Sequence, residues 1–300
     1  MATSARAPPR SGWGRSDRGP SAPRSRRSSS APPSAAADGV LHLPAALAAL
    51  LEALAIQIGT NLHNDLEDAA RGADGPDRLG PQRATAMGWL RPRQVLAAAV
   101  ASFGFALLVG VYLVARGGWP IVALGLASLA SGWAYTGGPR PLAYVGLGDL
   151  FVLAFFGVAA VVGTYYVQGL ETCAAAWWLG VGVGALSTAI LAVNNLRDRS
   201  SDRAAGKRTL AVRLGPGAVR AEYTLCLGVA FAVLLGVAAH GHPGALAGLL
   251  ALPRALRLRG AVASTDGPAL NPLLGATARL LALYGALVSA GLLVAAALGG

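Results

Sequence analysis

Charge is scarce in this chain, and acidic charge is the scarcest. Charged residues make up 13% of the 300 positions, only 14 residues are aspartate or glutamate, and a single lysine occurs, Lys207. Soluble domains usually carry about 25% charged residues, so this composition disfavours a water-soluble protein. Hydrophobic residues reach 54%, which favours a membrane protein.

Cysteines and nucleotide-binding motifs are also lacking. The two cysteines, Cys173 and Cys226, lie at or within apolar segments without metal-ligand spacing, which indicates small buried side chains. Gly206-Lys207 is followed by arginine and lacks the glycine spacing of a phosphate loop. The sequence therefore disfavours an ATPase.

Long apolar runs are abundant, and several reach the roughly 20 residues that cross a hydrocarbon core. The runs are continuous in leucine, alanine, valine and glycine, which predicts helices rather than alternating membrane strands. The expected fold is an all-α bundle with about eight membrane spans. The expected spans are approximately Leu41–Leu62, Val95–Val114, Trp119–Tyr135, Phe151–Val167, Ala174–Val193, Tyr223–Ala239, Ala245–Leu258 and Leu273–Leu298.

The net charge of +11 follows this topology and does not indicate a nucleic-acid partner. Four expected spans separate the loop 63–94 from the loop 194–220, so both loops lie on one side of the bilayer. That side collects most of the arginines after residue 39, whereas the opposite loops hold only Arg116. This bias predicts a multi-pass protein of the cell membrane whose arginine-rich loops face the cytoplasm.

Residues 1–39 differ in composition from the rest of the chain. They are rich in arginine, serine, proline and alanine, and they contain no apolar run long enough for a signal peptide. The span count would place their seven arginines on the opposite side of the membrane. We expect a disordered, basic, low-complexity segment over 1–39 and a transmembrane domain over 40–300.

The scarce aspartates gather in two clusters that share one pattern, asparagine followed by spaced aspartates. Asp65 and Asp68 are three residues apart on a helix and share one face, and Asp198 and Asp202 are four apart and do the same. The clusters and their basic neighbours are Asn61, Asn64, Asp65, Asp68, Arg71 and Asp74, followed by Asn194, Asn195, Arg197, Asp198, Asp202, Lys207 and Arg208.

Carboxylates at helix ends beside hydrocarbon repel one another unless a cation lies between them. Oxygen ligands without sulfur suit Mg²⁺, which shares its coordination shell with substrate phosphates. We therefore expect Asp65, Asp68, Asp74, Asp198 and Asp202 to bind magnesium. Nearby arginines and Lys207 would hold a diphosphate. One such cluster is more often a solvated helix end, but two clusters of the same pattern make coincidence a poor explanation.

At these residues the chain resembles the UbiA superfamily of intramembrane prenyltransferases, which pair an Asn-Asp-x-x-Asp cluster with a later Asp-x-x-x-Asp cluster. The stretches 57–81, 134–142, 163–168 and 206–215 are most similar to the subgroup that acts on 1,4-dihydroxy-2-naphthoate in menaquinone biosynthesis. Members usually have nine spans. At the N-terminus of this chain we expect the first of these helices to be absent or replaced by the low-complexity stretch.

The resemblance implies a helical bundle around a central cavity, with the clusters at its cytoplasmic mouth and a side opening to lipid. It implies magnesium-dependent transfer of a polyprenyl group from its diphosphate to dihydroxynaphthoate, with loss of carbon dioxide and diphosphate, giving demethylmenaquinone. Asp65, Asp68, Asp198 and Asp202 would be the catalytic aspartates. The substrate-binding candidates are Asn61, Asn64, Arg71, Arg78, Tyr135, Arg140, Asn194, Asn195, Arg197, Lys207 and Arg208.

Two other functions stay open. The same chemistry could use another acceptor, such as hydroxybenzoate, homogentisate, haem or chlorophyllide, because acceptor choice is a property of the pocket. A magnesium or proton transporter would need polar groups that continue across the membrane. Glu52, within the first expected span, must face the bundle interior or a water-filled cavity, either with a structural partner or with a catalytic role.

Overall fold

The computed structural model describes residues 41–72, 79–80, 83–139 and 141–299. Within these ranges the chain forms helices joined by turns and no strand, which confirms the all-α expectation. The segment 1–39 lies outside the described residues. So do three site candidates, Asp74, Arg78 and Arg140.

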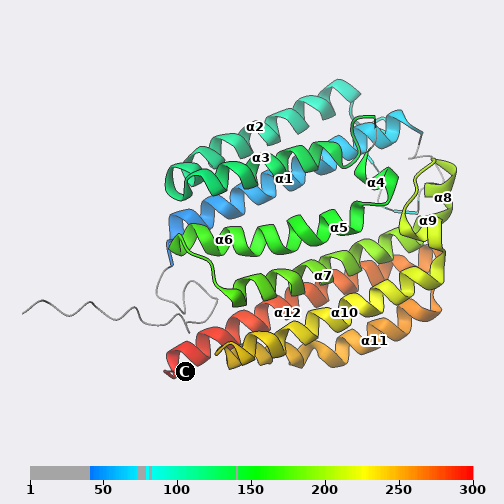
Figure 1. Cartoon of the computed structure of the whole chain (residues 1–300). Helices are drawn as coiled ribbons and strands as arrows, with labels where there is room; N and C mark the ends of the chain where they lie inside the picture. The colour runs from blue at the N-terminus through cyan, green and yellow to red at the C-terminus, as the bar shows by residue number, and fades with distance from the viewer. Residues whose placement is uncertain (1–40, 73–78, 81–82, 140, 300) are drawn as a thin grey trace, which may run out of the picture.

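The first helical group consists of α1 (Leu43–Ala70), α2 (Pro92–Gly117) and α3 (Trp119–Ala134), which pack on one another (Figure 1). A proline occupies the first turn of each helix, where its missing N–H costs nothing. Gly118, with φ of 67°, joins α2 to α3 through a conformation that favours glycine. The sharp turn folds α3 back along α2.

The second helical group is built around α7, the most buried of the long apolar helices. Within this group two tyrosine hydroxyls form hydrogen bonds inside the protein. Tyr284 donates to the carbonyl of Ala230 at 2.8 Å, and Tyr223 and Thr277 share a hydrogen bond of 3.1 Å. The elements of this group are α7 (Ala174–Arg197), α10 (Pro216–Ala239), η2 (Pro243–Ala251), α11 (Leu252–Ser264), η3 (Gly267–Leu270) and α12 (Asn271–Ala297).

A continuous helical segment lies between the two groups and changes its winding midway (Figure 1). It starts as α5 (Gly148–Val152), continues as the π-helical η1 (Leu153–Ala159) and ends as α6 (Ala160–Gly169). Gly157 packs directly on α7: a Cβ atom there would overlap the Cα of Gly184 and lie 2.5 Å from the carbonyl oxygen of Gly180. Two backbones meet at this point because neither has a side chain in the way.

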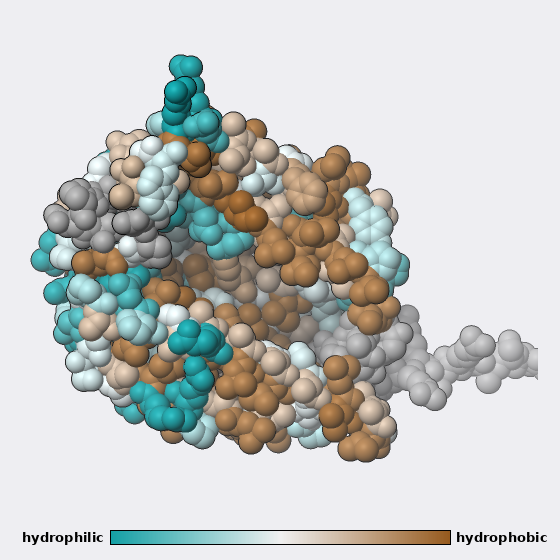
Figure 2. Space-filling model, turned by 180° about the vertical axis from the view of Figure 1, so that it is seen from behind, coloured by the Kyte–Doolittle hydropathy of each residue, from teal (hydrophilic) through white to brown (hydrophobic). Residues whose placement is uncertain are grey.

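Six helical segments in the described ranges are long and apolar enough to cross a bilayer. The α3 helix has 16 residues and is shorter than the others. The expected span Ala245–Leu258 differs in kind, because it begins as a 3₁₀ helix at Pro243 and continues as an α-helix to Ser264. Leucines on the outer faces of the helices are exposed, for example Leu108 and Leu235, as suits contact with lipid (Figure 2).

Hydrogen bonds tie the helices together at the end opposite the aspartate clusters. Arg116 donates to the carbonyls of Val167 and Gln168 at 2.5 and 2.7 Å, and Tyr166 donates to the carbonyl of Gly117 at 2.9 Å. The backbone N–H of His42 donates to the side chain of Gln168 at 2.9 Å. These contacts join α1, α2 and α6 at that end of the bundle.

Candidate active site

The two aspartate clusters meet at one end of the bundle. The α1 helix carries Asp68 near its C-terminus, and α8 (Arg199–Ala204), which follows α7, carries Asp202. The ammonium of Lys207 lies between them, 3.1 Å from a carboxylate oxygen of Asp68 and 3.9 Å from one of Asp202. Residues about 140 positions apart in the chain thus form one charged centre.

The first cluster is anchored to the chain around it. Asp65 is buried and accepts hydrogen bonds from the backbone N–H groups of Ala84 and Thr85, the shortest at 3.0 Å. Asn64 accepts a hydrogen bond from Thr136. Arg71 pairs with Glu67 at 2.9 Å and also donates to the carbonyls of Thr136 and Gly138. The expected metal ligand Asp65 therefore also fixes the segment that leads into α2.

The second cluster contains a buried ion pair. Arg197 is 3% exposed and donates two hydrogen bonds to Asp198, at 2.7 and 2.6 Å. It also donates to Asn194 at 2.7 Å and to Asn271 at 2.9 Å. The guanidinium of Arg197 is thus engaged within the protein and orients Asp198. Its expected contact with substrate stays a prediction.

The remaining candidates lie along the cavity, in the protein interior and at the surface. Asn61, Asn64 and Tyr135 line a cavity that opens beneath the charged centre. Asn195 is buried and lies 3.5 Å from a carboxylate oxygen of Asp149. Arg208 is exposed at the same end as Lys207, and its backbone N–H donates to the carbonyl of Tyr144.

Tyr144, on the short helix α4 (Leu142–Val145), is a site residue that the sequence did not reveal. Its hydroxyl donates to Asp68 at 3.0 Å, and its ring lies between two cations, 5.2 Å from Arg71 and 5.1 Å from Lys207. Burial, and then the charge of Asp68, raise the pKa of the Tyr144 phenol well above its usual value, so it remains a donor. Tyr144 therefore connects both clusters.

Substitutions of Tyr144 separate the contribution of its hydroxyl group to activity from that of its ring. Tyr144→Phe removes the hydrogen bond to Asp68 and keeps the ring between Arg71 and Lys207. Tyr144→Leu removes both. Residues that hold metal ligands in place typically contribute about 10- to 100-fold to metal affinity or activity. We therefore expect activity to fall about tenfold in Tyr144→Phe and further in Tyr144→Leu. Steady-state kcat and KM for a prenyl diphosphate would measure both.

The matched control is Tyr112→Phe, on the outer face of α2, where the tyrosine is 40% exposed. It should leave both constants unchanged. Wild-type kinetics in both Tyr144 variants would contradict the role of Tyr144.

The charged centre suits a divalent cation whose coordination shell is completed by a bound ligand. Burial raises the pKa of the Asp202 carboxyl to about 6; Lys207 opposes this rise, and Asp198 and Asp68 add to it. Gathering these carboxylates is therefore unfavourable without more positive charge. No three acidic, histidine or cysteine side chains within the described ranges are close enough to form a metal centre from protein atoms alone. Magnesium, which keeps open positions for phosphate oxygens, fits this oxygen-only set.

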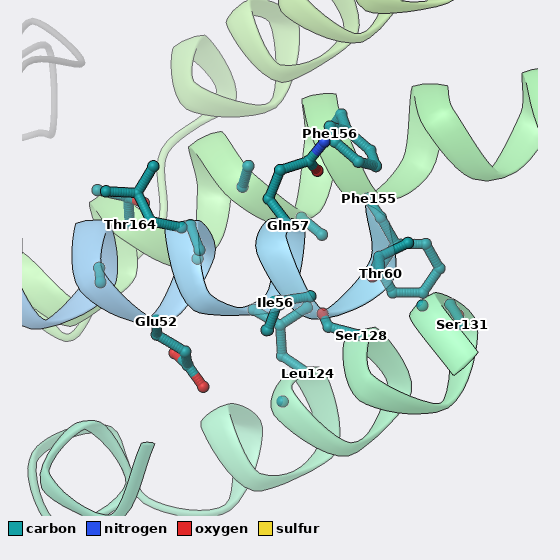
Figure 3. Close-up of a pocket in the computed structure, with 18 of the residues that line it drawn as sticks. Glu52, Ile56, Gln57, Thr60, Leu124, Ser128, Ser131, Phe155, Phe156 and Thr164 are labelled. Atoms are coloured by element: carbon teal, nitrogen blue, oxygen red, sulfur yellow. The ribbon is translucent and has the colours of Figure 1, made fainter. Parts of the chain in front are cut away.

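A cavity of about 670 Å³ lies next to the charged centre and runs into the bundle between α1, α3 and the η1–α6 segment (Figure 3). Phe151, Phe155 and Phe156 line the wall formed by the middle segment. Thr60, Ser128 and Ser131 place hydroxyls on the opposite wall. The surface is visibly hollowed between two groups of hydrophobic side chains (Figure 2).

Tyr135 stands where the cavity meets the charged centre. Burial, and then the carboxylates of Asp149, Asp68 and Asp202, hold the pKa of its phenol far above the usual value. Its hydroxyl is thus a permanent hydrogen-bond donor. Apolar helices around a cavity beside a charged centre are typical of an integral membrane protein, and such a cavity suits a ligand with an anionic head and a hydrophobic body.

Comparison with known proteins agrees with this architecture. The UbiA prenyltransferase family matches residues 33–269. The chain is 43% identical over 226 residues to 1,4-dihydroxy-2-naphthoate octaprenyltransferase of Mycobacterium tuberculosis, covering 74% of this chain and 75% of that protein. It is 31% identical over 251 residues to the Bacillus subtilis protein of the same name, covering 83% and 81%.

A solved structure shares the fold. A UbiA homolog from Archaeoglobus fulgidus, bound to DMAPP and Mg²⁺, superposes with a TM-score of 0.56 over 84% of this chain and 93% of its own. At 15% identity this likeness concerns the fold alone. From the family match and the identities above, the chain belongs to the UbiA prenyltransferase family.

Proposed function

We propose that the protein transfers a polyprenyl group from its diphosphate to 1,4-dihydroxy-2-naphthoate, using Mg²⁺, and releases carbon dioxide and diphosphate. The direct product would be demethylmenaquinol, the reduced form of demethylmenaquinone, an intermediate of menaquinone biosynthesis. The acceptor follows from the names of the relatives that are 31–43% identical over most of the chain. Transfer of a prenyl group follows from membership of the family.

The observation that carries the proposal is the contact of Lys207 with Asp68 and Asp202, next to the apolar cavity that Asn64 and Tyr135 line. An allylic diphosphate needs charge at its head and an apolar space for its tail, and the two adjoin here. Asp65, Asp68, Asp198 and Asp202, with Asp74 next, are the proposed magnesium ligands. Bound magnesium would draw negative charge onto the leaving diphosphate and weaken the allylic carbon–oxygen bond.

The residues of the chain supply positioning and charge. Lys207, Arg71 and Arg208, with Arg78 and Arg140 from outside the described residues, would bind the diphosphate oxygens. Asn61 and Asn64, at the top of the cavity, would hold the donor head or the acceptor by their amides. Tyr135 would donate a hydrogen bond at the junction of the two substrates, because its phenol stays protonated.

The bond changes balance without a further reagent. The allylic carbon–oxygen bond breaks, and the diphosphate leaves with the electron pair. The ring carbon that bears the carboxylate then attacks the allylic cation. The carbon–carboxylate bond breaks next, and its electrons restore the aromatic ring as carbon dioxide departs. The phenylalanine wall of the cavity would exclude water, which would otherwise quench the cation.

Isotopic labels test the acceptor directly. Membranes that contain the protein would receive acceptor labelled either in the ring or in the carboxyl group, together with a prenyl diphosphate and magnesium. We expect ring label in the lipid product and carboxyl label only in carbon dioxide. Product that keeps the carboxyl label would show the decarboxylation to be wrong, and product from hydroxybenzoate alone would favour the rival acceptor.

The same assay in excess chelator serves as the control for the metal. Turnover should stop and return when Mg²⁺ is added in excess. Full turnover in chelator would contradict the magnesium assignment, while the labelled products would still identify the acceptor.

We also propose that the charged centre faces the cytoplasm, because the arginine bias predicts it. In a background with Cys173→Ala and Cys226→Ala, single cysteines would replace Met87, Arg208 or, at the other end, Glu171; all three native residues are exposed. An impermeant maleimide applied to intact cells should label position 171 only. Labelling of 87 and 208 from opposite sides would contradict the assembled centre as well as its orientation.

A further inference from the structure

Glu52 is an ionisable residue in the middle of a membrane helix, away from the charged centre. It projects from α1 toward α2 and α3, on the opposite side of the helix from Gln57 (Figure 3). Two glycines make room for its carboxyl group: a Cβ atom on Gly110 would lie 3.0 Å from its Oε1 atom, and one on Gly125 would lie 3.7 Å away. The helices are thus shaped around this side chain.

No described residue forms a hydrogen bond or ion pair with Glu52. The side chain lines the cavity. Its neighbours along the same end of the lining include the apolar Leu113, Ile121 and Leu124 and the hydroxyl-bearing Thr164 (Figure 3). A carboxyl group at this depth is costly, so an unpaired one in the wall of a substrate cavity indicates a functional constraint.

The place of Glu52 along the cavity is set by the helix. It precedes Asp65 by 13 residues, which corresponds to about 20 Å along α1. Only about one further turn of α1, reaching Ala49, lines the cavity beyond it. Glu52 therefore lies near the end of the cavity farthest from the charged centre.

The cavity also has a side opening, which lies at the level of Glu52. Leu50, Leu54 and Phe156 line it and are nevertheless 56%, 50% and 47% exposed, respectively. They come from α1 and η1, so the opening lies between these two elements on the lipid-facing side. A long apolar chain in the cavity thus has two routes, onward past Glu52 or sideways into lipid.

We propose that Glu52 is a specificity-determining residue for the prenyl donor: it keeps the tail out of the far end of the cavity and directs it between α1 and η1. This inference rests on the proposed function. A tail that passed Glu52 would take water away from a carboxyl group without offering a hydrogen bond. A tail that turns aside at Leu54 and Phe156 meets only apolar surface.

Donor length gives the test, because only long tails reach Glu52. A geranyl chain is roughly 10 Å long when extended and a geranylgeranyl chain roughly 20 Å, from the lengths of their carbon–carbon bonds. The measured quantity is the ratio of kcat/KM for geranylgeranyl diphosphate to that for geranyl diphosphate. Glu52→Leu replaces the carboxyl with an apolar group of similar size, and Glu52→Gln keeps a polar one.

We expect Glu52→Leu to raise this ratio about tenfold, since the far end of the cavity then becomes a second apolar route, which only long donors reach. Glu52→Gln should leave the ratio near the wild-type value. Activity with geranyl diphosphate should stay within about twofold in both variants, which shows that they are folded. An unchanged ratio in Glu52→Leu, or an equal rise in both variants, would overturn the assignment.

Gly110→Ala supplies a second arm that does not alter Glu52 itself. The added methyl group would press on the carboxyl group and move it into the cavity. The ratio should then fall, and an unchanged ratio would contradict the role of Glu52 even if Glu52→Leu failed to fold. Wild-type protein that transfers neither donor to the naphthoate would instead contradict the proposed function, and Glu52's role with it.

Discussion

Replacing Asp68 with asparagine should reduce turnover by about 100-fold or more, because removal of one preorganised electrostatic group from a reacting centre typically costs that much. Asp68 is 4% exposed and receives both the ammonium of Lys207 and the hydroxyl of Tyr144. Asparagine keeps the shape and one acceptor oxygen but removes the charge that pairs with Lys207. Rates with saturating donor and acceptor, beside a thermal melt, would separate lost chemistry from lost folding.

The matched control for this variant is Asp266→Asn. Asp266 also pairs with a cation, Arg220 at 3.0 Å, but its side chain is 74% exposed and far along the chain from both clusters. Turnover there should stay within about twofold of wild type, since exposed ion pairs contribute little. An Asp68→Asn enzyme with near-normal rates would remove Asp68 from the site.

Replacing Gly157 with alanine should lower the free energy of unfolding by about 3 kcal/mol, at the upper end of the usual cost of overpacking. The new methyl group would overlap the Cα of Gly184, and backbone cannot move aside as a flexible side chain can. The η1 segment must then move away from α7. Melting temperature in detergent is the measurement, and activity should fall with it because η1 carries Phe155 and Phe156 of the cavity wall.

Gly228→Ala is the control for this packing argument. Gly228 lies within α10, and a Cβ atom there would meet no other atom within 4 Å. Alanine is the better helix former, so this variant should be neutral or slightly more stable. Equal destabilisation by both alanines would show that the contact between Gly157 and Gly184 is unimportant.

Much of the fold could be predicted because the apolar runs are long and helices satisfy their own backbone groups in lipid. The change to π-helical winding at Leu153 could not be predicted, since nothing in the local sequence marks it. The 3₁₀ turn after Pro243 was missed for the same reason. Both depend on how the segment packs against its neighbours, which a single-sequence pattern does not report.

The sequence indicated the charged residues of the candidate site, but it did not indicate the residues that hold them in place. The spacing of Asp65 and Asp68 predicted a shared face, yet it could not show that Asp65 holds the backbone at Ala84 and Thr85, about 20 residues later. Tyr144 gave no signal because a tyrosine near a span end is usually an interfacial anchor. Its meaning comes from the meeting of α1, α4 and the Lys207 loop, which is tertiary information.

The hydrogen bonds of Arg116, Gln168 and Tyr166 at the far end of the bundle have a consequence for the electrical potential across the membrane. Moving one elementary charge through a potential of about 100 mV is worth about 2.3 kcal/mol, so any continuous aqueous path would discharge the membrane. These hydrogen bonds tie α2 to the end of α6 on the far side of Glu52 from the charged centre. For the proposed prenyl transfer, exchange of diphosphate would then take place at the end that carries Lys207, and the tied far end would keep the membrane sealed to protons.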